Sequence, residues 1–527
     1  MPHKVLITTS GIGSRLAELT QYTNKALVRV GKKPVISHIV ETYPVETRFV
    51  ITLGYLGNQV RDFLSLAYPK HHFEYVEVKN FDGLGSSLGL SMLEAKGLLQ
   101  CPFIFHACDT LITGAVPSPG KNWIGVYKSN DTRHYASWIL RNGKLCFNEK
   151  GAVDADFIHI GLVGINDYQL FWQELETLYK IDPNNKTLND CQTLIKMIDK
   201  GCATELVEFP RWCDIGNKAS LDKARQEYGS SEDDLDKLGE AVYIFDEFVI
   251  KFFADEKITQ NRFRRGQILE GFVPKVEGLR GNFYKYQFVS GGLYSHVVQP
   301  TDFKQFLEWA QNKFWRDEHE LDKKDFSKIC HSFYFDKTNT RINQFLKANN
   351  LKDTEHVING ERVPAVSEIL KLVDFDRLSD GLQSRFHGDF ILDNILKTSN
   401  GYCLLDWRQD FGGLLNIGDR YYDIAKLNHN LVINHSVINK DLFKVESDGG
   451  ITCVEIMRSS TLVDCQSTLF DFMRKYKYDI RKVRFLTAII WLNMAPLHHY
   501  PFNYFLYYFG KLNLWRALKQ NDILRKL

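Results

Sequence analysis

The chain has 527 residues, which exceeds the usual size of one domain and suits two domains of about 200 to 300 residues each. It carries 66 Lys and Arg against 64 Asp and Glu, a net charge of +2. Nucleic acids and acidic membranes bind strongly basic surfaces, so this balance argues against both as partners. The sequence contains no basic leader and no uninterrupted apolar stretch of about twenty residues, so we expect a soluble, cytoplasmic protein.

The first predicted element is a buried strand at Val5–Thr8, an apolar run typical of α/β sheets. The turn that follows contains Ser10, Gly11 and Gly13 and reaches the cation Arg15. Glycines allow the backbone to approach phosphates, and exposed N–H groups together with Arg15 would neutralise their charge. Taken alone, such a turn is more often a tight strand–helix connection that binds nothing.

Two aspartates follow predicted strands further along the chain. Phe103–His106 predicts a buried strand, and Asp109 follows it, where an α/β sheet places ligand-binding groups. Asp214 lies in the segment Arg211–Gly216. Each aspartate by itself is equally consistent with a solvated surface residue or a helix cap.

The ten cysteines form no Cys-x-x-Cys pair, so the sequence predicts neither a zinc ribbon nor a redox dithiol. Cys108 and Cys213 directly precede the two aspartates. Successive side chains of a strand face opposite sides, so a cysteine and the adjacent aspartate would not point at one ion. We expect both thiols to be small buried groups in a reducing compartment.

With Lys25 in the segment Thr23–Pro34, these motifs resemble the nucleotidyltransferases that join a nucleoside triphosphate to a sugar phosphate, a family with phosphocholine cytidylyltransferase relatives. The family patterns are G-x-G-x-R, P-K-x-L, G-K-P and W-x-D-I-G. Asn24 stands where a proline is usual, and Ser10 where a glycine is. The resemblance covers roughly residues 1–227 and implies an α/β fold, a Rossmann-like sheet with flanking helices.

The resemblance also implies a role for each matching residue. Arg15 and Lys25 would be catalytic, and Asp109 and Asp214 would hold Mg²⁺. The residues expected to contact the nucleotide are Ser10, Gly11, Gly13, Gly85 and Ser86, and those expected to contact the phosphorylated substrate are Glu149, Lys150 and Gly161. The proline that usually follows the lysine of this last group is missing.

A polar, acidic, glycine-containing stretch at 227–234 predicts a linker. We therefore expect a first domain at 1–228, a linker at 229–238 and a second domain at 239–527. The second domain would open with a hairpin of two strands, Ala241–Phe245 and Phe248–Phe253.

The stretch His387–Asn394, followed by Leu404–Trp407, supplies the groups that phosphoryl transfer from ATP requires. A carboxylate must receive the proton of the acceptor hydroxyl, and an asparagine and a second carboxylate must hold Mg²⁺. The matching residues are Asp389, Asn394 and Asp406.

The pattern H-G-D-x4-N followed by L-D-W resembles the aminoglycoside phosphotransferase and choline kinase family, which phosphorylates small molecules on a protein-kinase-like (α+β) fold. Gly418–Ala425 matches the block that braces the catalytic loop. The resemblance implies that Lys251 binds the phosphates of ATP, although a lysine on an exposed strand is more often only solubilising. Glu270 is a candidate partner of this lysine, at a spacing that fits poorly, and Tyr284–Val289 would lie against adenine.

The C-terminal third is predicted to be helical from Phe303 onward. Its segment Tyr500–Phe509 has seven aromatics in ten residues. These aromatics would form either a box for a quaternary ammonium ligand or a packed helix or dimer contact. We favour packing, because Tyr504, Phe505 and Tyr508 share one helical face. The formation of a homo-oligomer through such a contact is left open by the sequence.

The two resemblances together predict a bifunctional enzyme. One half would phosphorylate a hydroxylated metabolite, with a sugar favoured, using ATP and Mg²⁺. The other would transfer a nucleotidyl group from a second triphosphate, CTP or UTP, to that phosphate and release pyrophosphate, making a precursor for surface polysaccharide. The alternatives are a choline kinase and phosphocholine cytidylyltransferase that makes CDP-choline, or a chain in which one half is a non-catalytic remnant.

Overall fold

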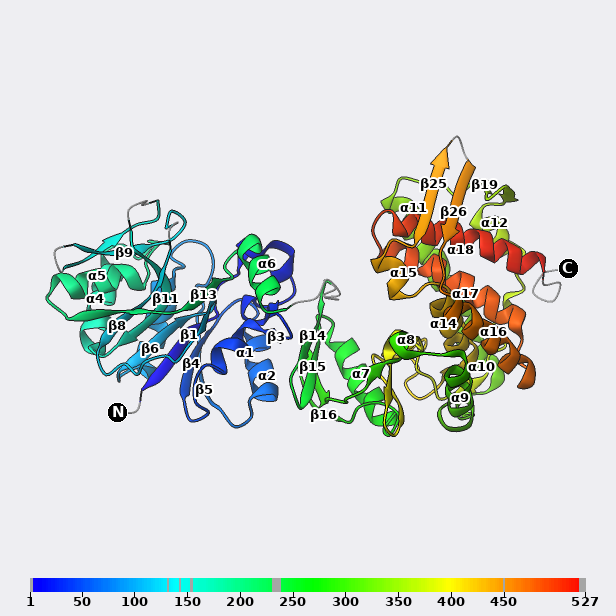
Figure 1. Ribbon diagram of the computed structural model, residues 1–527, viewed down its shortest axis with the longest axis horizontal. Coiled ribbons are helices and arrows are strands. Elements are labelled where there is room, and N and C mark those ends of the chain that lie inside the picture. Colours follow the sequence, from blue (N-terminus) through cyan, green and yellow to red (C-terminus); the bar gives the residue numbers. More distant parts are fainter. Residues whose placement is uncertain are drawn as a thin grey trace. The chain divides into compact units, whose positions relative to one another are not determined.

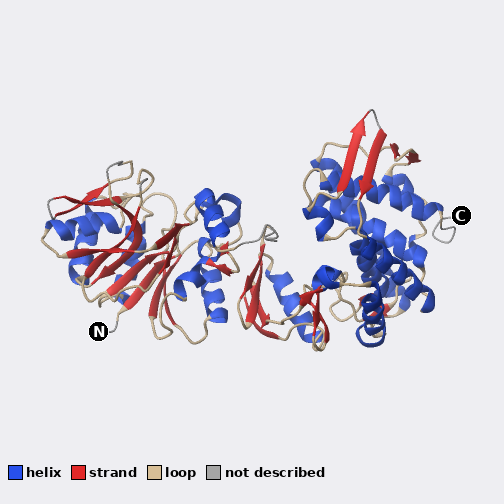
Figure 2. Cartoon of the chain, viewed as in Figure 1, coloured by secondary structure: helices blue, strands red, loops and turns tan. Residues whose placement is uncertain are grey.

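The computed structural model describes residues 3–129, 132–141, 144–151, 155–229, 238–448 and 451–520 (Figure 1). The chain forms two compact units, one of Met1–Thr259 with Glu277–Phe288 and one of Gln260–Val276 with Val289–Leu527. Most of the linker predicted at 229–238 lies outside the described residues. Strands dominate the first unit and helices the second (Figure 2).

The first unit is built on a nine-stranded sheet whose main path runs β10-β9-β11-β6-β1-β4-β5, with β8 joining β11 to β12. The central strand β1 pairs in parallel with β4 and β6, and its apolar residues are fully buried because both faces of the sheet are covered. The strands are β1 Lys4–Thr8, β4 Arg48–Leu53, β5 His72–Glu77, β6 Phe103–Ala107, β8 Asn122–Lys128, β9 Ser137–Arg141, β10 Lys144–Asn148, β11 Phe157–Ile165 and β12 Thr204–Glu208.

Helices cover both faces of this sheet, so the predicted Rossmann-like arrangement of the first unit is confirmed. Ile7 and Phe49 face a core shared with α1 and α2, whereas Leu6 and Val50 face a second core shared with α3, α4 and α5. The helices are α1 Val35–Val40, α2 Gly57–Ala67, α3 Leu88–Ala95, α4 Tyr168–Ile181, α5 Asp190–Asp199 and α6 Lys218–Glu227.

A small antiparallel sheet, ordered β14-β15-β17-β16, shares the core of the first unit. Its Tyr243 ring lies 5.3 Å from that of Phe63 on α2, and the Tyr243 hydroxyl donates to the carbonyl of Leu27 at 2.7 Å. The strands predicted to open the second domain therefore pack on the first unit. The four strands of this sheet are β14 Glu240–Ile244, β15 Phe248–Phe253, β16 Val276–Arg280 and β17 Phe283–Gln287, and β14 and β15 correspond to the two predicted strands.

The second unit is mainly helical, around α14, α17 and α18. Its larger helices are α7 Glu256–Ile268, α9 Pro300–Trp309, α10 Lys323–His331, α11 Lys337–Ala348, α14 Arg420–Val432, α16 Ser460–Lys475, α17 Ile480–Met494 and α18 Phe502–Lys519, and its shorter ones are α8 Tyr294–Val297, α12 Val366–Lys371, α13 Phe375–Leu378 and α15 His435–Asn439. Its strands are β18 Gly292–Leu293, β19 His356–Ile358, β20 Glu361–Val363, β22 Ile395–Thr398, β23 Gly401–Leu404, β25 Phe443–Asp448 and β26 Ile451–Ile456, with a β21–β24 bridge between Gln383–Ser384 and Gly418–Asp419.

The aromatic segment at the C-terminus forms α18 and is largely packed inside the second unit. Tyr507 stacks on Phe345 at 4.6 Å, and Phe509 contacts Trp491 at 4.7 Å. Tyr507 lies off the face predicted from the sequence, so the helix is buried on more sides than one apolar stripe indicates. Within the described part of the chain, no helix combines the length and the apolar character needed to cross a bilayer.

Candidate functional site

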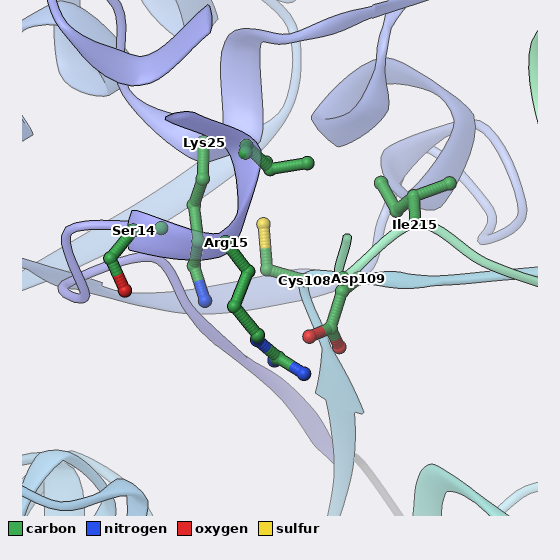
Figure 3. A pocket seen from close by; sticks show the side chains of 9 residues that line it. Ser14, Arg15, Lys25, Cys108, Asp109 and Ile215 are labelled. Atoms are coloured by element: carbon green, nitrogen blue, oxygen red, sulfur yellow. The ribbon is translucent and has the colours of Figure 1, made fainter. Parts of the chain in front are cut away.

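A cavity of about 180 Å³ in the first unit brings together Arg15, Lys25 and Asp109, three of the charged residues singled out in the sequence (Figure 3). Strand pairing brings the carboxylate of Asp109 to this cavity and that of Asp214 beside its lining residue Gly216. Asp109 directly precedes β7 (Thr110–Thr113), Asp214 ends β13 (Arg211–Asp214), and the antiparallel pairing sets Thr110 opposite Asp214. The cavity is lined by Gly13, Ser14, Arg15, Leu16, Lys25, Cys108, Asp109, Ile215 and Gly216.

Three charged side chains converge at Gly216. A Cβ placed on Gly216 would lie 3.0 Å from Asp214 Oδ1 and 3.3 Å from both Asp109 Oδ2 and Arg15 Nη2. The Gly216 N–H donates to Asp214 Oδ1 at 2.8 Å, and the Tyr135 hydroxyl donates to Asp214 Oδ2 at 3.3 Å. Two carboxylates facing one point form an oxygen donor set that fits Mg²⁺.

Cys108 lines this cavity, but its sulfur points away from the Asp109 carboxylate (Figure 3). Burial raises the pKa of the Cys108 thiol to about 12 and that of Cys213 to about 11. Both thiols are therefore protonated at neutral pH, which does not favour metal binding.

Lys25 is held in place by Asn24, a residue that the sequence motifs did not single out for a role. The Asn24 side chain accepts from the N–H of Ala26 at 2.8 Å and donates to the carbonyls of Thr9 at 3.1 Å and Tyr55 at 2.6 Å. It therefore caps the helical turn Lys25–Leu27 and ties it to the loop after β1. Asparagine is a preferred N-cap residue, and this preference is the feature of the sequence that could have predicted the capping role of Asn24.

Lys25 also lines a second cavity of about 240 Å³, together with Ser10, Gly11 and Ser86. Ser10 Oγ lies 2.9 Å from Ser91 Oγ on α3, which joins the loop after β1 to this helix. The other lining residues are Thr8, Phe81, Ser87, Leu88 and Ser91. Gly85 lines neither cavity; with φ of +79° it shapes the turn before α3.

None of the three residues expected to contact the phosphorylated substrate lines either cavity. Gly161 lies beside the end of β6, since a Cβ on it would be 2.8 Å from the Cβ of Ala107. Glu149 and Lys150 follow β10, are exposed and line neither cavity. The positive charge of Lys150 lowers the pKa of the Cys191 thiol, against the larger effect of burial. This lysine therefore lies near the start of α5.

His159 and Asp190 form a buried polar pair near Gly161, which the sequence motifs did not predict. Trp138 Nε1 donates to His159 Nδ1 at 3.2 Å, so the other ring nitrogen, Nε2, carries the proton and donates to Asp190 Oδ2 at 2.9 Å. Cys191 lies close to this pair. Because both ring nitrogens of His159 are used, we interpret the pair as structural.

In the second unit, the loop that contains Asp389 is fixed from two sides. The buried Asp423 accepts from the N–H groups of His387 at 2.8 Å and Gly388 at 2.7 Å, which is the bracing expected of the block Gly418–Ala425. Burial raises the pKa of Asp423 to about 6, against the effect of those donors. His387, whose pKa burial lowers to about 4, is neutral and donates from Nε2 to the carbonyl of Leu405 at 2.9 Å.

Asp389 itself is bound by two side chains. Asn394 Nδ2 donates to Asp389 Oδ2 at 3.0 Å, and Lys426 Nζ on α14 lies 2.6 Å from Asp389 Oδ1. Burial alone would raise the pKa of Asp389, but the charge and hydrogen bond of Lys426 outweigh burial and lower it to about 2. The carboxylate is therefore ionised and oriented at neutral pH.

Asp406 follows β23 and is joined to the Asp389 loop by the backbone, because the N–H of Leu405 donates to the carbonyl of Asn394 at 2.7 Å. Its φ of +55° is rare for a residue with a side chain. Asp406 Oδ1 pairs with Arg262 on α7. The amide oxygen of Asn394 and the carboxylate of Asp406 are donors of the type that Mg²⁺ takes, although an ion at Asp406 would displace Arg262.

The remaining residues predicted for ATP binding are divided between the two units. Lys251 is on β15 of the first unit and is buried. Glu270 belongs to the second unit and lies beyond the end of α7 rather than on that helix, where the partner was expected.

No family model matches this chain. It is 30% identical over 125 residues to a probable glucose-1-phosphate cytidylyltransferase of Bacillus subtilis, which covers 23% of this chain and 46% of that protein. It is also 34% identical over 86 residues to a choline-phosphate cytidylyltransferase of Streptococcus pneumoniae, covering 15% of this chain and 37% of that protein. The chain thus matches less than half the length of these curated relatives.

Among solved structures, the CTP:phosphocholine cytidylyltransferase of Streptococcus pneumoniae is similar over 43% of this chain and 99% of its own, with 18% identity and a TM-score of 0.37. A UDP-glucose pyrophosphorylase covers 44% of this chain and 99% of its own, with 19% identity and a TM-score of 0.36. The N-terminal region of the chain resembles sugar-phosphate and choline-phosphate nucleotidyltransferases. These matches do not bear on the second unit.

Proposed function

We propose that the first unit transfers a nucleotidyl group from a nucleoside triphosphate to the phosphate of a small molecule and releases pyrophosphate. The observation that carries this proposal is the convergence of Asp109, Asp214 and Arg15 at Gly216, which lines the first cavity. Lys25 lines both this cavity and the second one. The names of the curated relatives favour CTP over UTP.

Each charged group has a place in this reaction. An oxygen of the acceptor phosphate attacks the α-phosphorus of the triphosphate, and the bond to pyrophosphate breaks. Arg15 and Lys25 neutralise the negative charge that grows on the α-phosphate and the leaving group. Asp109 and Asp214 would hold Mg²⁺, which supplies further positive charge there.

The test is a screen of the intact chain for pyrophosphate release. Each common nucleoside triphosphate is paired with a set of sugar phosphates and with phosphocholine. We expect one pyrimidine triphosphate with one class of phosphate to give turnover. Absence of turnover with every pair would exclude the proposal.

For the second unit we propose phosphoryl transfer from ATP to a hydroxyl. Support comes from Asp389, an ionised carboxylate oriented by Asn394 and Lys426 on a loop that Asp423 braces. The hydroxyl oxygen attacks the γ-phosphorus, ADP leaves, and Asp389 orients the hydroxyl and accepts its proton. Asn394 and Asp406 would hold Mg²⁺. The alternative is a non-catalytic second unit.

The product of this second reaction is the substrate type of the first, so we propose that the chain makes a nucleotide-activated precursor from a free hydroxyl compound. The intact chain, given acceptor, ATP, CTP or UTP and Mg²⁺, should form the nucleotide-linked product in one pot. If the phosphate made by the kinase reaction is never accepted by the nucleotidyl-transfer reaction, the two activities belong to different syntheses.

A further inference from the structure

Four cations surround the loop of Asp389 in the second unit. Lys426 pairs with Asp389. Arg408 packs directly on the preceding residue, because a Cβ on Gly388 would lie 2.6 Å from the Cβ of Arg408. Lys337 and Arg341 come from the first turns of α11, four residues apart and therefore on one face.

Lys337 and Arg408 lie over the same aromatic ring. Lys337 Nζ is 4.2 Å and Arg408 Cζ is 5.2 Å from the centroid of Phe333. Since both cations contact one ring, the start of α11 and the segment after Asp406 lie next to each other. The cluster of Lys337, Arg341 and Arg408, called here the cation cluster, therefore adjoins the carboxylate proposed to receive the acceptor hydroxyl.

The cation cluster has little internal compensation. In the described part of the chain, none of its three members forms an ion pair. Arg408 Nε is buried without a hydrogen-bond partner, and Arg341 Nη1 meets only the neutral Gln344, at 3.4 Å. Burial, then the charges of Arg408, Lys426 and Arg341, lower the pKa of Lys337 to about 6, against the effect of Asp410, so without a bound counter-charge this lysine is largely neutral at pH 7.

Cations gathered at a half-buried place require a counter-charge, because each repels the others and has lost part of its hydration. A negatively charged substrate would supply this counter-charge. We propose that the acceptor of the phosphotransferase unit is an anion, a hydroxy compound that carries a carboxylate or a phosphate, which the cation cluster binds. This inference rests on the proposed kinase function.

The γ-phosphate of ATP is the other anion that such cations could bind. Lys426 contacts Asp389, so it is well placed to bind the phosphoryl group that is transferred. The cation cluster includes two residues from α11, whereas the proposed metal ligands Asn394 and Asp406 flank β22 and β23. We therefore assign the cluster to the acceptor. A quaternary ammonium acceptor such as choline would be repelled there.

The test uses the full chain with ATP and Mg²⁺ and acceptors matched except for charge: glucose with glucuronate, glycerol with glycerate and glycerol 3-phosphate, and choline. ADP formation is measured. We expect an anionic member to exceed its neutral partner in kcat/KM by about 10- to 100-fold, since a charge-assisted hydrogen bond contributes about 1.5–3 kcal/mol. Equal or better use of neutral acceptors or choline overturns the inference.

Arg341→Gln then identifies which substrate the cluster serves. We expect it to raise the KM of the anionic acceptor about tenfold and to leave the KM of ATP unchanged. Lys347→Gln, an exposed residue on the same helix, is the matched control. A rise confined to the KM of ATP assigns the cluster to the nucleotide and overturns the inference. No ADP formation with any acceptor instead refutes the kinase function itself.

Discussion

Carboxylates at the two proposed centres are held by different kinds of partner. In the first unit Asp214 accepts hydrogen bonds from neutral donors, the Gly216 N–H and the Tyr135 hydroxyl. In the second unit Asp389 and Asp406 each pair with a cation, Lys426 and Arg262. Positive charge in the first unit therefore stays available to substrate phosphates, whereas part of that in the second is already used inside the protein.

This difference has a chemical reason. A nucleotidyl transfer brings two highly charged phosphate compounds together, so free cations and metal-binding carboxylates serve it best. A kinase must also align a neutral hydroxyl, which needs one carboxylate in a fixed orientation. The ion pair with Lys426 keeps Asp389 ionised with a pKa of about 2 and holds it in place.

The largest expected effect separates the two centres. Asp389→Asn keeps the shape of the side chain but removes the group that orients and deprotonates the acceptor. Such a loss lowers a rate by about two to four orders of magnitude. ADP formation should collapse while nucleotidyl transfer from a supplied phosphate continues, and Asp376→Asn, exposed in the same unit, should change neither. Near wild-type ADP formation would remove Asp389 from the mechanism.

The reciprocal change is Lys25→Met. It deletes a cation that lines both cavities of the first unit, where charge grows in the transition state. We expect pyrophosphate release to fall about 100-fold or more, mainly in kcat, with kinase turnover unchanged. Lys32→Met, exposed and seven residues along, is the control. A change in KM alone would make Lys25 a peripheral contact.

A smaller effect is expected from Asn24→Ala, which removes the cap of the turn that carries Lys25. Loss of an N-cap costs about 0.5–2 kcal/mol. Chemical denaturation should show this loss, and nucleotidyl transfer should fall further than stability alone explains, because Lys25 is no longer fixed. Unchanged activity in a correctly folded variant would show that Lys25 is positioned by other contacts.

The last expected effect concerns Lys337, is on stability alone and has the opposite sign. An unfolded lysine has a pKa of about 10.4, whereas burial and then Arg408, Lys426 and Arg341 lower the folded pKa to about 6. Between these values the unfolded chain binds more protons, so stability rises with pH. Lys337→Met removes this penalty, and at pH 7 we expect a melting temperature higher by about 2–4 °C per kcal/mol gained.

The pH dependence supplies the control for this variant. The difference in melting temperature should vanish above about pH 10.5, where lysine is neutral in both states. Lys347→Met should show no such trend. A variant less stable than wild type at pH 7 would mean that Lys337 is paired in solution and carries no penalty.

Much of the first unit could be predicted from the sequence, because its signals are local. The apolar run at Val5–Thr8 became the central strand, and glycines mark where the backbone must turn or make room, as at Gly13 and Gly161. The order of the motifs along the chain indicated that Asp109 and Asp214 belong together. Their meeting at Gly216 depends on the pairing of β7 with β13, which no local pattern shows.

In the second unit the sequence by itself determined the Asp389 loop and its brace, because both are short motifs whose hydrogen bonds follow from their spacing. Only the tertiary structure decided which cations meet that loop. Lys337, Arg408 and Lys426 belong to separate segments, and nothing in their neighbours distinguishes them from solvated lysines and arginines. The tertiary structure also decided the position of β14 and β15. These strands belong to the core of the first unit because Tyr243 packs against Phe63 there. Packing between distant segments is set by the shape and burial of whole surfaces, whereas a motif records only what its own residues can do.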